Sequence, residues 1–384
     1  MYDFNKIVSR ETTNCAKWDT VEKGLLPMWV ADMDFQSPPE VIAALKERAE
    51  HGIFGYSGGY GGWFEALMQW MEKRYGWAPQ RGWISTSPGV VAALFMLVRA
   101  LTEPGDRIIL QPPVYRPFYY VASSNGCELL ENPLYFDGHK YRMDLEQLRQ
   151  TVDSRVKLLI LCSPHNPVGR VWNREELLSL GQFCLEHEIT IISDEIHSDL
   201  VFSGYKHTVL ASLFKELEQN TVICNAPSKT FNIAGIPASN VIIANENLRS
   251  AYRRVLRGSG LALPNVFAVT AVETAYTYGE AWLKELLLYL EDNYRLASSY
   301  IAERIPEIKV AEPEGTYLLW LDCRGLGLND KELDGFIKEK ARLLLEPGPI
   351  FGTGGSGFQR MNIACPRSRL LEALQRLEKA VRGQ

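Results

Sequence analysis

The sequence lacks the features of membrane-inserted and nucleic-acid-binding proteins. Its longest apolar run, Val90 to Val98, is far shorter than the roughly 18 residues of a membrane-spanning helix. The 41 basic and 46 acidic residues give a net charge of −5 and form no long basic tract, so nucleic acid and anionic membranes are not expected partners. The first residues, MYDFNKIVSRETTN, contain no apolar segment of the secretory type, so we expect no such signal.

The sequence also lacks the cysteine patterns of disulfide frameworks and metal sites. Its seven cysteines are scattered, odd in number and without a Cys-x-x-Cys pair. Cys162 and Cys224 lie within apolar, strand-like runs. Such thiols are typical of buried, reduced side chains, and we expect a cytoplasmic protein. No histidine spacing matches that of metal ligands, so no metal is expected.

The middle of the chain alternates short apolar runs with helical patterns. The runs predict strands at 108–111, 157–162, 189–193, 222–224 and 241–244. Strands buried on both faces by helices have this composition, and the βαβ spacing predicts an α/β fold with a mostly parallel sheet. Farther upstream, Ser37 and Glu40 predict a capping box that opens a helix.

After about residue 270 the pattern changes to long helical periodicity, followed by a strand pair around TYLLWLD and QRMNIAC. A chain of 384 residues is long enough for about two domains. We predict a large α/β domain over residues 40–275. Residues 1–39 and 276–384 are predicted to form a smaller α+β domain, because the N-terminal arm is too short to stand alone.

Chemically capable residues follow several of the predicted strands. Asn166, Asp194 and Lys229 each come shortly after a different strand, and Tyr115 comes after a fourth. Gly89 precedes an apolar helix. Because ligands of an open parallel sheet bind beyond the carboxyl ends of its strands, we expect these groups to meet at one rim.

This set of groups is what pyridoxal phosphate requires. A lysine of lowered pKa forms the imine, a carboxylate holds the pyridine nitrogen protonated, and a helix N-terminus accommodates the phosphate. Each residue alone has a simpler explanation, since Lys229 could be a surface cation, Asp194 a helix cap and Asn166 a turn residue. Their convergence favours the cofactor.

The chain resembles fold-type I pyridoxal-phosphate-dependent transferases of the class I/II aminotransferase family. Within them it looks like the branch of MalY/PatB-type cystathionine β-lyases, which are cysteine C–S lyases. The resemblance covers nearly the whole chain. Its marks, in the family's order, are PMWVADMDF at 27–35, SPGVV at 87–91, PPVY at 112–115, PHNPVGR at 164–170, SDEIHSDL at 193–200, SKTFNIAG at 228–235 and QRMNIACP at 359–366.

The resemblance implies a role for each matching residue. Lys229 would carry the cofactor as a Schiff base and remove the substrate's α-proton. Tyr56, the second catalytic residue, would reach the cofactor phosphate from the other subunit of a homodimer. Arg360 would bind the carboxylate of a small amino-acid substrate.

The other cofactor contacts follow the same resemblance. Asp194 would pair with the pyridine nitrogen, Asn166 would donate to the phenolic oxygen, and Tyr115 would stack on the ring. The phosphate would be bound by the backbone N–H groups of Gly89, Val90 and Val91, and by Ser228.

Three positions depart from the pattern of many relatives. Ala226 replaces a serine that donates to the phosphate, and Pro237 replaces an arginine. His197 stands where aminotransferases commonly have tyrosine, so we expect it either to contact the cofactor or to be a structural histidine. Tyr56 could be an ordinary loop residue and Arg360 part of a surface ion pair.

The resemblance implies β-elimination from L-cystathionine or a related cysteine thioether, giving a thiol, pyruvate and ammonia. The alternatives are an amino acid aminotransferase and a regulatory binding protein on the same fold. A separate G-x-G-x-x-G pattern at 352–357 precedes a predicted strand, whereas a dinucleotide fingerprint opens a helix. We therefore interpret it as a loop that places Arg360.

Overall fold

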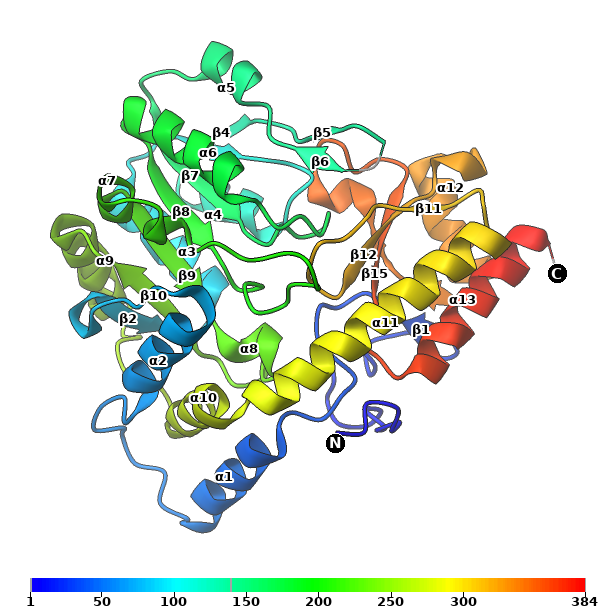
Figure 1. The fold of residues 1–384 in the computed structure, drawn as a ribbon, viewed down its shortest axis with the longest axis horizontal. Helices are drawn as coiled ribbons and strands as arrows, with labels where there is room; N and C mark the ends of the chain where they lie inside the picture. The colour runs from blue at the N-terminus through cyan, green and yellow to red at the C-terminus, as the bar shows by residue number, and fades with distance from the viewer. Residues whose placement is uncertain (1, 139, 384) are drawn as a thin grey trace.

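The computed structural model describes residues 2–138 and 140–383. Its main element is a seven-stranded sheet (Figure 1). In spatial order, the strands are β2 (Ile84–Ser87), β10 (Ser239–Ile243), β9 (Thr221–Asn225), β8 (Thr190–Asp194), β7 (Val156–Cys162), β3 (Arg107–Leu110) and β4 (Glu128–Glu131). The strand β10 runs antiparallel to both of its neighbours, and the other four pairings of this sheet are parallel. The predicted α/β fold with a mostly parallel sheet is therefore confirmed.

Both faces of this sheet are buried. Alternate residues of β7 point to opposite sides, so that Leu158 and Ile160 belong to one apolar cluster while Leu159 and Leu161 belong to another. The first cluster includes side chains of α3 (Val90–Leu101), α4 (Pro117–Ser124) and α9 (Glu246–Gly258). The second includes side chains of α2 (Trp63–Tyr75), α6 (Arg174–Glu186), α7 (Lys215–Gln219) and α10 (Val266–Tyr278). Burial on both faces explains the continuous apolar runs in the strand sequences.

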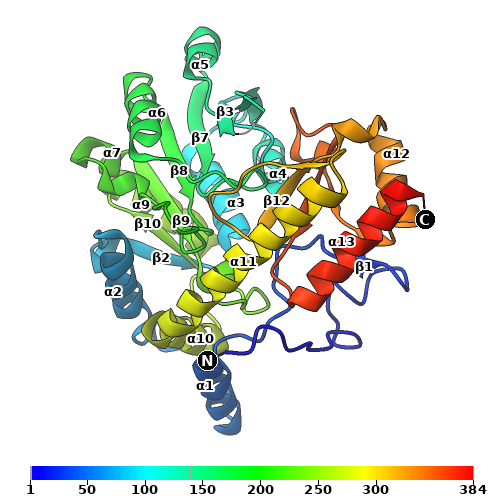
Figure 2. The same cartoon turned by 45° about the vertical axis from the view of Figure 1, so that its right-hand side comes forward.

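The helices fill the connections between strands and form much of the C-terminal part. In chain order they are α1 (Pro39–Glu50), α2 (Trp63–Tyr75), α3 (Val90–Leu101), α4 (Pro117–Ser124), α5 (Leu145–Thr151), α6 (Arg174–Glu186), α7 (Lys215–Gln219), α8 (Pro227–Thr230), α9 (Glu246–Gly258), α10 (Val266–Tyr278), α11 (Glu280–Arg304), α12 (Asp330–Gly335) and α13 (Arg367–Arg382). The long α11 leads from α10 into the C-terminal part, where α13 lies alongside it in both views (Figures 1 and 2). No helix within residues 2–138 and 140–383 is both long and apolar enough to span a bilayer.

A second, four-stranded antiparallel sheet lies in the C-terminal part. Its order is β11 (Lys309–Val310), β12 (Leu318–Asp322), β15 (Phe358–Asn362) and β14 (Glu346–Pro347). The N-terminal arm joins this part through β1 (Leu26–Pro27), which pairs with β13 (Leu343–Leu344). A short hairpin is formed by β5 (Tyr135–Phe136) and β6 (Tyr141–Arg142). The proposed domain limits of 40–275 and 1–39 with 276–384 stay a prediction.

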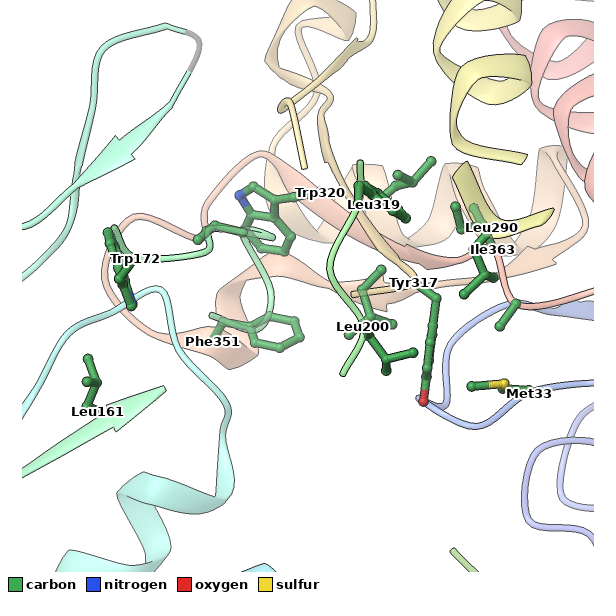
Figure 3. Packing of buried hydrophobic residues seen from close by; sticks show 14 of the residues in the cluster. Met33, Leu161, Trp172, Leu200, Leu290, Tyr317, Leu319, Trp320, Phe351 and Ile363 are labelled. Carbon is green, nitrogen blue, oxygen red and sulfur yellow. The ribbon is translucent and has the colours of Figure 1, made fainter. Parts of the chain in front are cut away.

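Buried side chains of the C-terminal sheet reach toward the N-terminal arm. Figure 3 shows Tyr317, which directly precedes β12, with its hydroxyl pointing toward the arm segment that holds Met33. That hydroxyl donates a 2.9 Å hydrogen bond to the carbonyl oxygen of Ala31. This hydrogen bond therefore ties the arm segment to the C-terminal sheet.

The predicted capping box at the start of α1 is wrong. The helix begins at Pro39 after Pro38, and no described side chain caps it. The Ser37 hydroxyl instead donates to the carbonyl oxygen of Asn232 at 3.0 Å, so a tertiary contact replaces the local one. The 352–357 loop leads into strand β15 and not into a helix. It therefore lacks the strand-to-helix setting of a dinucleotide-binding fingerprint, as predicted.

Candidate active site

A cavity of about 280 Å³ opens at the carboxyl ends of the central strands. It gathers most of the residues predicted from sequence, namely Gly89, Val90, Val91, Tyr115, Asn166, Asp194, His197, Ser228 and Lys229. Arg360 adjoins it through a hydrogen bond to Asn166. The sheet topology accounts for this meeting, because parallel strands deliver the residues that follow them to a common edge.

Lys229 lies on α8, directly after β9. Pro227 starts this short helix, and the hydroxyl of Thr230 donates to the buried carboxylate of Asp199 at 2.9 Å, which anchors the turn. The Lys229 amine donates to the carbonyl oxygen of Ala31 at 2.6 Å. Burial, and to a lesser extent the positive charge of Arg360, lower the pKa of Lys229 to about 8. Such an amine is neutral often enough near pH 8 to act as a nucleophile or base.

Asp194 ends β8 and is buried, with 4% of its surface exposed. One carboxylate oxygen accepts a 3.1 Å hydrogen bond from the backbone N–H of Ile196. Burial raises the pKa of Asp194 to about 7, although that hydrogen bond and Lys229 act in the opposite direction. A buried acid of this kind is stabilised in its ionised form by a cationic partner, which fits a protonated ring nitrogen.

The N-terminus of α3 opens into the same cavity. Gly89 is its N-cap with a φ of 127°, a conformation that favours glycine, and no described side chain caps the helix. The free N–H groups of the first turn and the hydroxyl-bearing Ser228 therefore fit an anion. Ala226 and Pro237 add no cation, and Lys229 is the only cation among the described residues that line the cavity. A phosphate would rely mainly on the helix terminus.

Arg360, on β15, is 3% exposed and almost surrounded by acceptors. Its Nη1 donates to the Asn166 side-chain oxygen at 2.9 Å, and its Nη2 donates to the carbonyl of Trp29 at 2.8 Å. Glu346 lies 3.3 Å from the same Nη2. Because the Asn166 oxygen accepts from Arg360, its amide nitrogen is left to donate toward the cavity.

Two rings flank the cavity. Tyr115 lines it, and burial together with the charge of Asp194 raises the pKa of its phenol. His197 is 3% exposed, and its Nδ1 has no hydrogen-bond partner among the described residues. Burial lowers the pKa of His197 to about 3, so the ring is neutral at physiological pH and can donate or accept one hydrogen bond on the cavity side.

Within a single chain, Tyr56 does not line this cavity. It is 99% exposed on the glycine-rich loop between α1 and α2 and lines a separate hollow. Sequence reasoning also missed functional neighbours of the site, namely Ala31, Tyr317 and Glu346. The motif PMWVADMDF marked the segment of Ala31, but a backbone carbonyl leaves no signature in residue type.

Comparison with known proteins gives consistent matches over the whole chain. The model of the family described as aminotransferase class I and II matches residues 25–377. Cystathionine β-lyase PatB of Bacillus subtilis (strain 168) is 46% identical, over 99% of this chain and 100% of that protein. Protein MalY of Escherichia coli (strain K12) is 33% identical over 100% of both chains. The crystal structure of cystalysin from Treponema denticola, which contains pyridoxal 5'-phosphate, superposes with a TM-score of 0.96 at 37% identity, covering 100% of this chain and 99% of that one.

Proposed function

We propose a function from the premise that this chain belongs to the aminotransferase class I and II family. The resemblance inferred from its motifs is confirmed, and the chain is a pyridoxal-phosphate-dependent carbon–sulfur lyase. Its proposed reaction is β-elimination from L-cystathionine or a related cysteine thioether, which consumes one water molecule and yields a thiol, pyruvate and ammonia. The observation that carries this proposal is the meeting of Lys229, Asp194 and Asn166 in one cavity of a chain 46% identical to a cystathionine β-lyase.

The residues present fit pyridoxal 5'-phosphate. Asp194 would hold the ring nitrogen, Asn166 the phenolic oxygen, and the α3 N-terminus with Ser228 the phosphate. Tyr115 would cover one face of the ring, and His197 would contact the cofactor from the cavity wall. When bound, the cofactor supplies an electron sink for the negative charge that develops at the substrate's α-carbon.

The protein's own groups perform the remaining tasks. Arg360 binds the α-carboxylate and thereby orients the α-hydrogen toward Lys229. The Lys229 amine removes that proton and can return it later to a departing group, and general acid–base catalysis of this kind contributes typically about 10²–10⁴-fold. The apolar walls of the cavity exclude water and strengthen each polar contact.

The two alternatives are not favoured. An aminotransferase would use the same lysine and acid, but the relative with 46% identity over nearly the whole chain is a cystathionine β-lyase. A regulatory binding protein would not need a lysine of lowered pKa beside a buried acid. We therefore favour β-elimination from a thioether over these two functions.

The working unit is proposed to be a homodimer in the cytoplasm. The loop of Tyr56 is unusually apolar for a surface, since Ile53 is 68% exposed and Phe54 58% exposed. Exposed apolar groups on a loop are typical of a protein interface. In a dimer, Tyr56 would enter the partner's cavity and bind the phosphate there.

The cysteines bear on the compartment in which the protein works. All seven are free and buried, which supports the proposal that the protein works in a reducing compartment, the cytoplasm.

The test is to incubate the purified holoenzyme with L-cystathionine in the absence of a keto acid. Steady release of pyruvate and thiol is expected, whereas turnover that starts only after a keto acid is added would identify an aminotransferase. Lys229→Ala should lose both the visible cofactor absorbance and pyruvate release. Lys157→Ala, which alters an exposed lysine on β7, is the matched control and should keep both.

A further inference from the structure

A second buried carboxylate, that of Asp199, lies on the same short stretch of chain as Asp194. The strand β8 ends at Asp194, and residues 196–199 form a turn directly after it. The backbone N–H of Ser198 donates to the carbonyl oxygen of Glu195 at 3.0 Å within this stretch. Asp199 is 4% exposed. The segment 194–199 therefore carries the acid assigned to the ring nitrogen at one end and Asp199 at the other.

The two oxygens of the Asp199 carboxylate contact different helices. Its Oδ1 accepts from the Trp70 indole N–H at 3.0 Å and from the Tyr75 hydroxyl at 2.6 Å, and the Nε of Arg74 lies 2.7 Å away. These three residues belong to α2. The Oδ2 accepts from the hydroxyl of Thr230, on α8, at 2.9 Å. Loss of the Thr230 hydroxyl would therefore release α8 and leave the contacts to α2 in place.

The helix α8, which carries Lys229, needs an anchor outside itself. It has four residues, little more than one turn, and a helix of this length is not stable alone. Thr230 is 1% exposed, and its β-branched side chain has restricted rotamers, so the contact of its hydroxyl with Asp199 fixes the backbone at residue 230. Lys229 is the residue before it. A shift of residue 230 would therefore move the Lys229 amine.

We propose that Asp199 is a positioning residue, which acts through Thr230 to hold Lys229 at the correct distance from the group bound by Asp194. This inference rests on the proposed function, because it takes Lys229 as the lysine that binds the cofactor and removes the α-proton. The lysine and the acid follow two neighbouring parallel strands, β9 and β8, and the contact between Asp199 and Thr230 joins the segments after those strands. A misplacement of about 1 Å between reacting groups can lower a rate about 100-fold, so such a joint matters for catalysis.

The test removes one hydroxyl at a time from the same carboxylate. Thr230→Val deletes the hydroxyl on α8 and keeps the shape of the side chain. Tyr75→Phe is the matched control, because it deletes a hydroxyl that contacts this carboxylate from α2. Thr230→Val should lower kcat for L-cystathionine about tenfold and change KM less than about twofold, since Arg360 still binds the substrate. Tyr75→Phe should keep both values within about twofold of wild type.

Two further variants separate positioning from folding. Thr230→Ser restores the hydroxyl and should restore kcat to within about threefold of wild type. Thr230→Ala deletes the hydroxyl without placing a methyl group beside the carboxylate, and it should behave as Thr230→Val does. Urea unfolding checks that each variant is folded under the assay conditions, and Thr230→Ala decides the result if Thr230→Val does not fold. A kcat equal to that of Tyr75→Phe in the deciding variant would overturn the proposal.

Uptake of the cofactor tests the inference apart from elimination. Each cofactor-free variant is mixed with pyridoxal phosphate, and the increase in visible absorbance is followed. Thr230→Val should take up the cofactor about tenfold more slowly than Tyr75→Phe, and Thr230→Ser should match wild type within about threefold. If no thioether releases pyruvate but this order of uptake rates holds, the lyase function fails and the positioning of Lys229 by Asp199 stands. Equal uptake rates in Thr230→Val and Tyr75→Phe would refute the positioning.

Discussion

The carbonyl oxygen of Ala31 accepts a 2.6 Å hydrogen bond from the Lys229 amine. The same oxygen accepts from the hydroxyl of Tyr317, so its two lone pairs are both used. The N-terminal arm thus touches the reactive lysine through its backbone. This contact holds the amine at the cavity wall, and the amine must leave it in order to react.

Uptake of the cofactor by the cofactor-free protein should depend on pH with a midpoint near 8. The lowered pKa of Lys229, about 8, means that the amine becomes neutral as the pH rises through this value. The rate should therefore increase up to about pH 8 and then level off. Stopped-flow absorbance after mixing with pyridoxal phosphate measures this rate.

A rate that keeps rising toward pH 10 would show an ordinary lysine pKa and contradict the prediction. Arg360→Gln provides a directional check. Its positive charge helps to lower the pKa of Lys229, so its removal should move the midpoint to higher pH.

Asp194→Asn should stabilise the cofactor-free protein at pH 8 while abolishing efficient elimination. The folded-state pKa of Asp194, about 7, lies above its ordinary value of 3.8, so the folded chain holds a proton that the unfolded chain releases between these values. This group therefore costs wild type stability as the pH rises from about 4 to about 7, by roughly 4 kcal/mol at most. Asparagine does not titrate and avoids that cost.

Urea unfolding of both cofactor-free proteins at pH 4.5 and pH 8 checks the sign. The difference in unfolding free energy should be small at pH 4.5 and should favour the variant at pH 8. A variant that is less stable than wild type at pH 8 would show that the Asp194 carboxylate is well paired without the cofactor.

Arg360→Ala should raise the KM for L-cystathionine by roughly 10- to 100-fold, the value of losing a charge-assisted hydrogen-bond pair. Cofactor absorbance should persist, because Arg360 is not among the residues proposed to contact the cofactor. Steady-state kinetics measure the effect, and Arg376→Ala, which breaks a surface pair with Glu372, is the control. An unchanged KM would mean that the carboxylate is bound elsewhere.

The sequence predicted the fold and the cavity residues that follow strands. Lys229, Asp194 and Asn166 could be placed because strand order and direction determine where strand ends meet, and buried strands have a clear composition. Because these strands are parallel, residues that follow different strands in the sequence lie together at one edge of the sheet.

The remaining parts could not be predicted because they depend on tertiary pairing between distant segments. Glu346 faces Arg360 only through the register of β14 and β15. Ala31 acts through a backbone oxygen, which every residue type possesses. Ser37 fits a local capping motif, yet a contact to Asn232, far along the chain, takes its hydroxyl. Local patterns carry no information about such competing partners.

Mixing two inactive variants should restore activity if Tyr56 serves the partner's cavity. Within its own chain Tyr56 is 99% exposed and lines a hollow other than the cavity of Lys229, so only a second subunit can bring the two residues together. In a hybrid of Lys229→Ala and Tyr56→Ala, one site receives the intact lysine from one chain and the intact tyrosine from the other. The second site carries both defects.

Random reassociation makes about half of all dimers hybrids, so activity should recover to about one quarter of wild type. The two variants are unfolded and refolded together with pyridoxal phosphate, and pyruvate release is compared with that of each variant refolded alone. Recovery that depends on co-refolding requires a shared site, because neither chain contains a complete one. Mass spectrometry checks that hybrid dimers have formed in the mixture. If they have formed and no activity is recovered, Tyr56 is an ordinary loop residue.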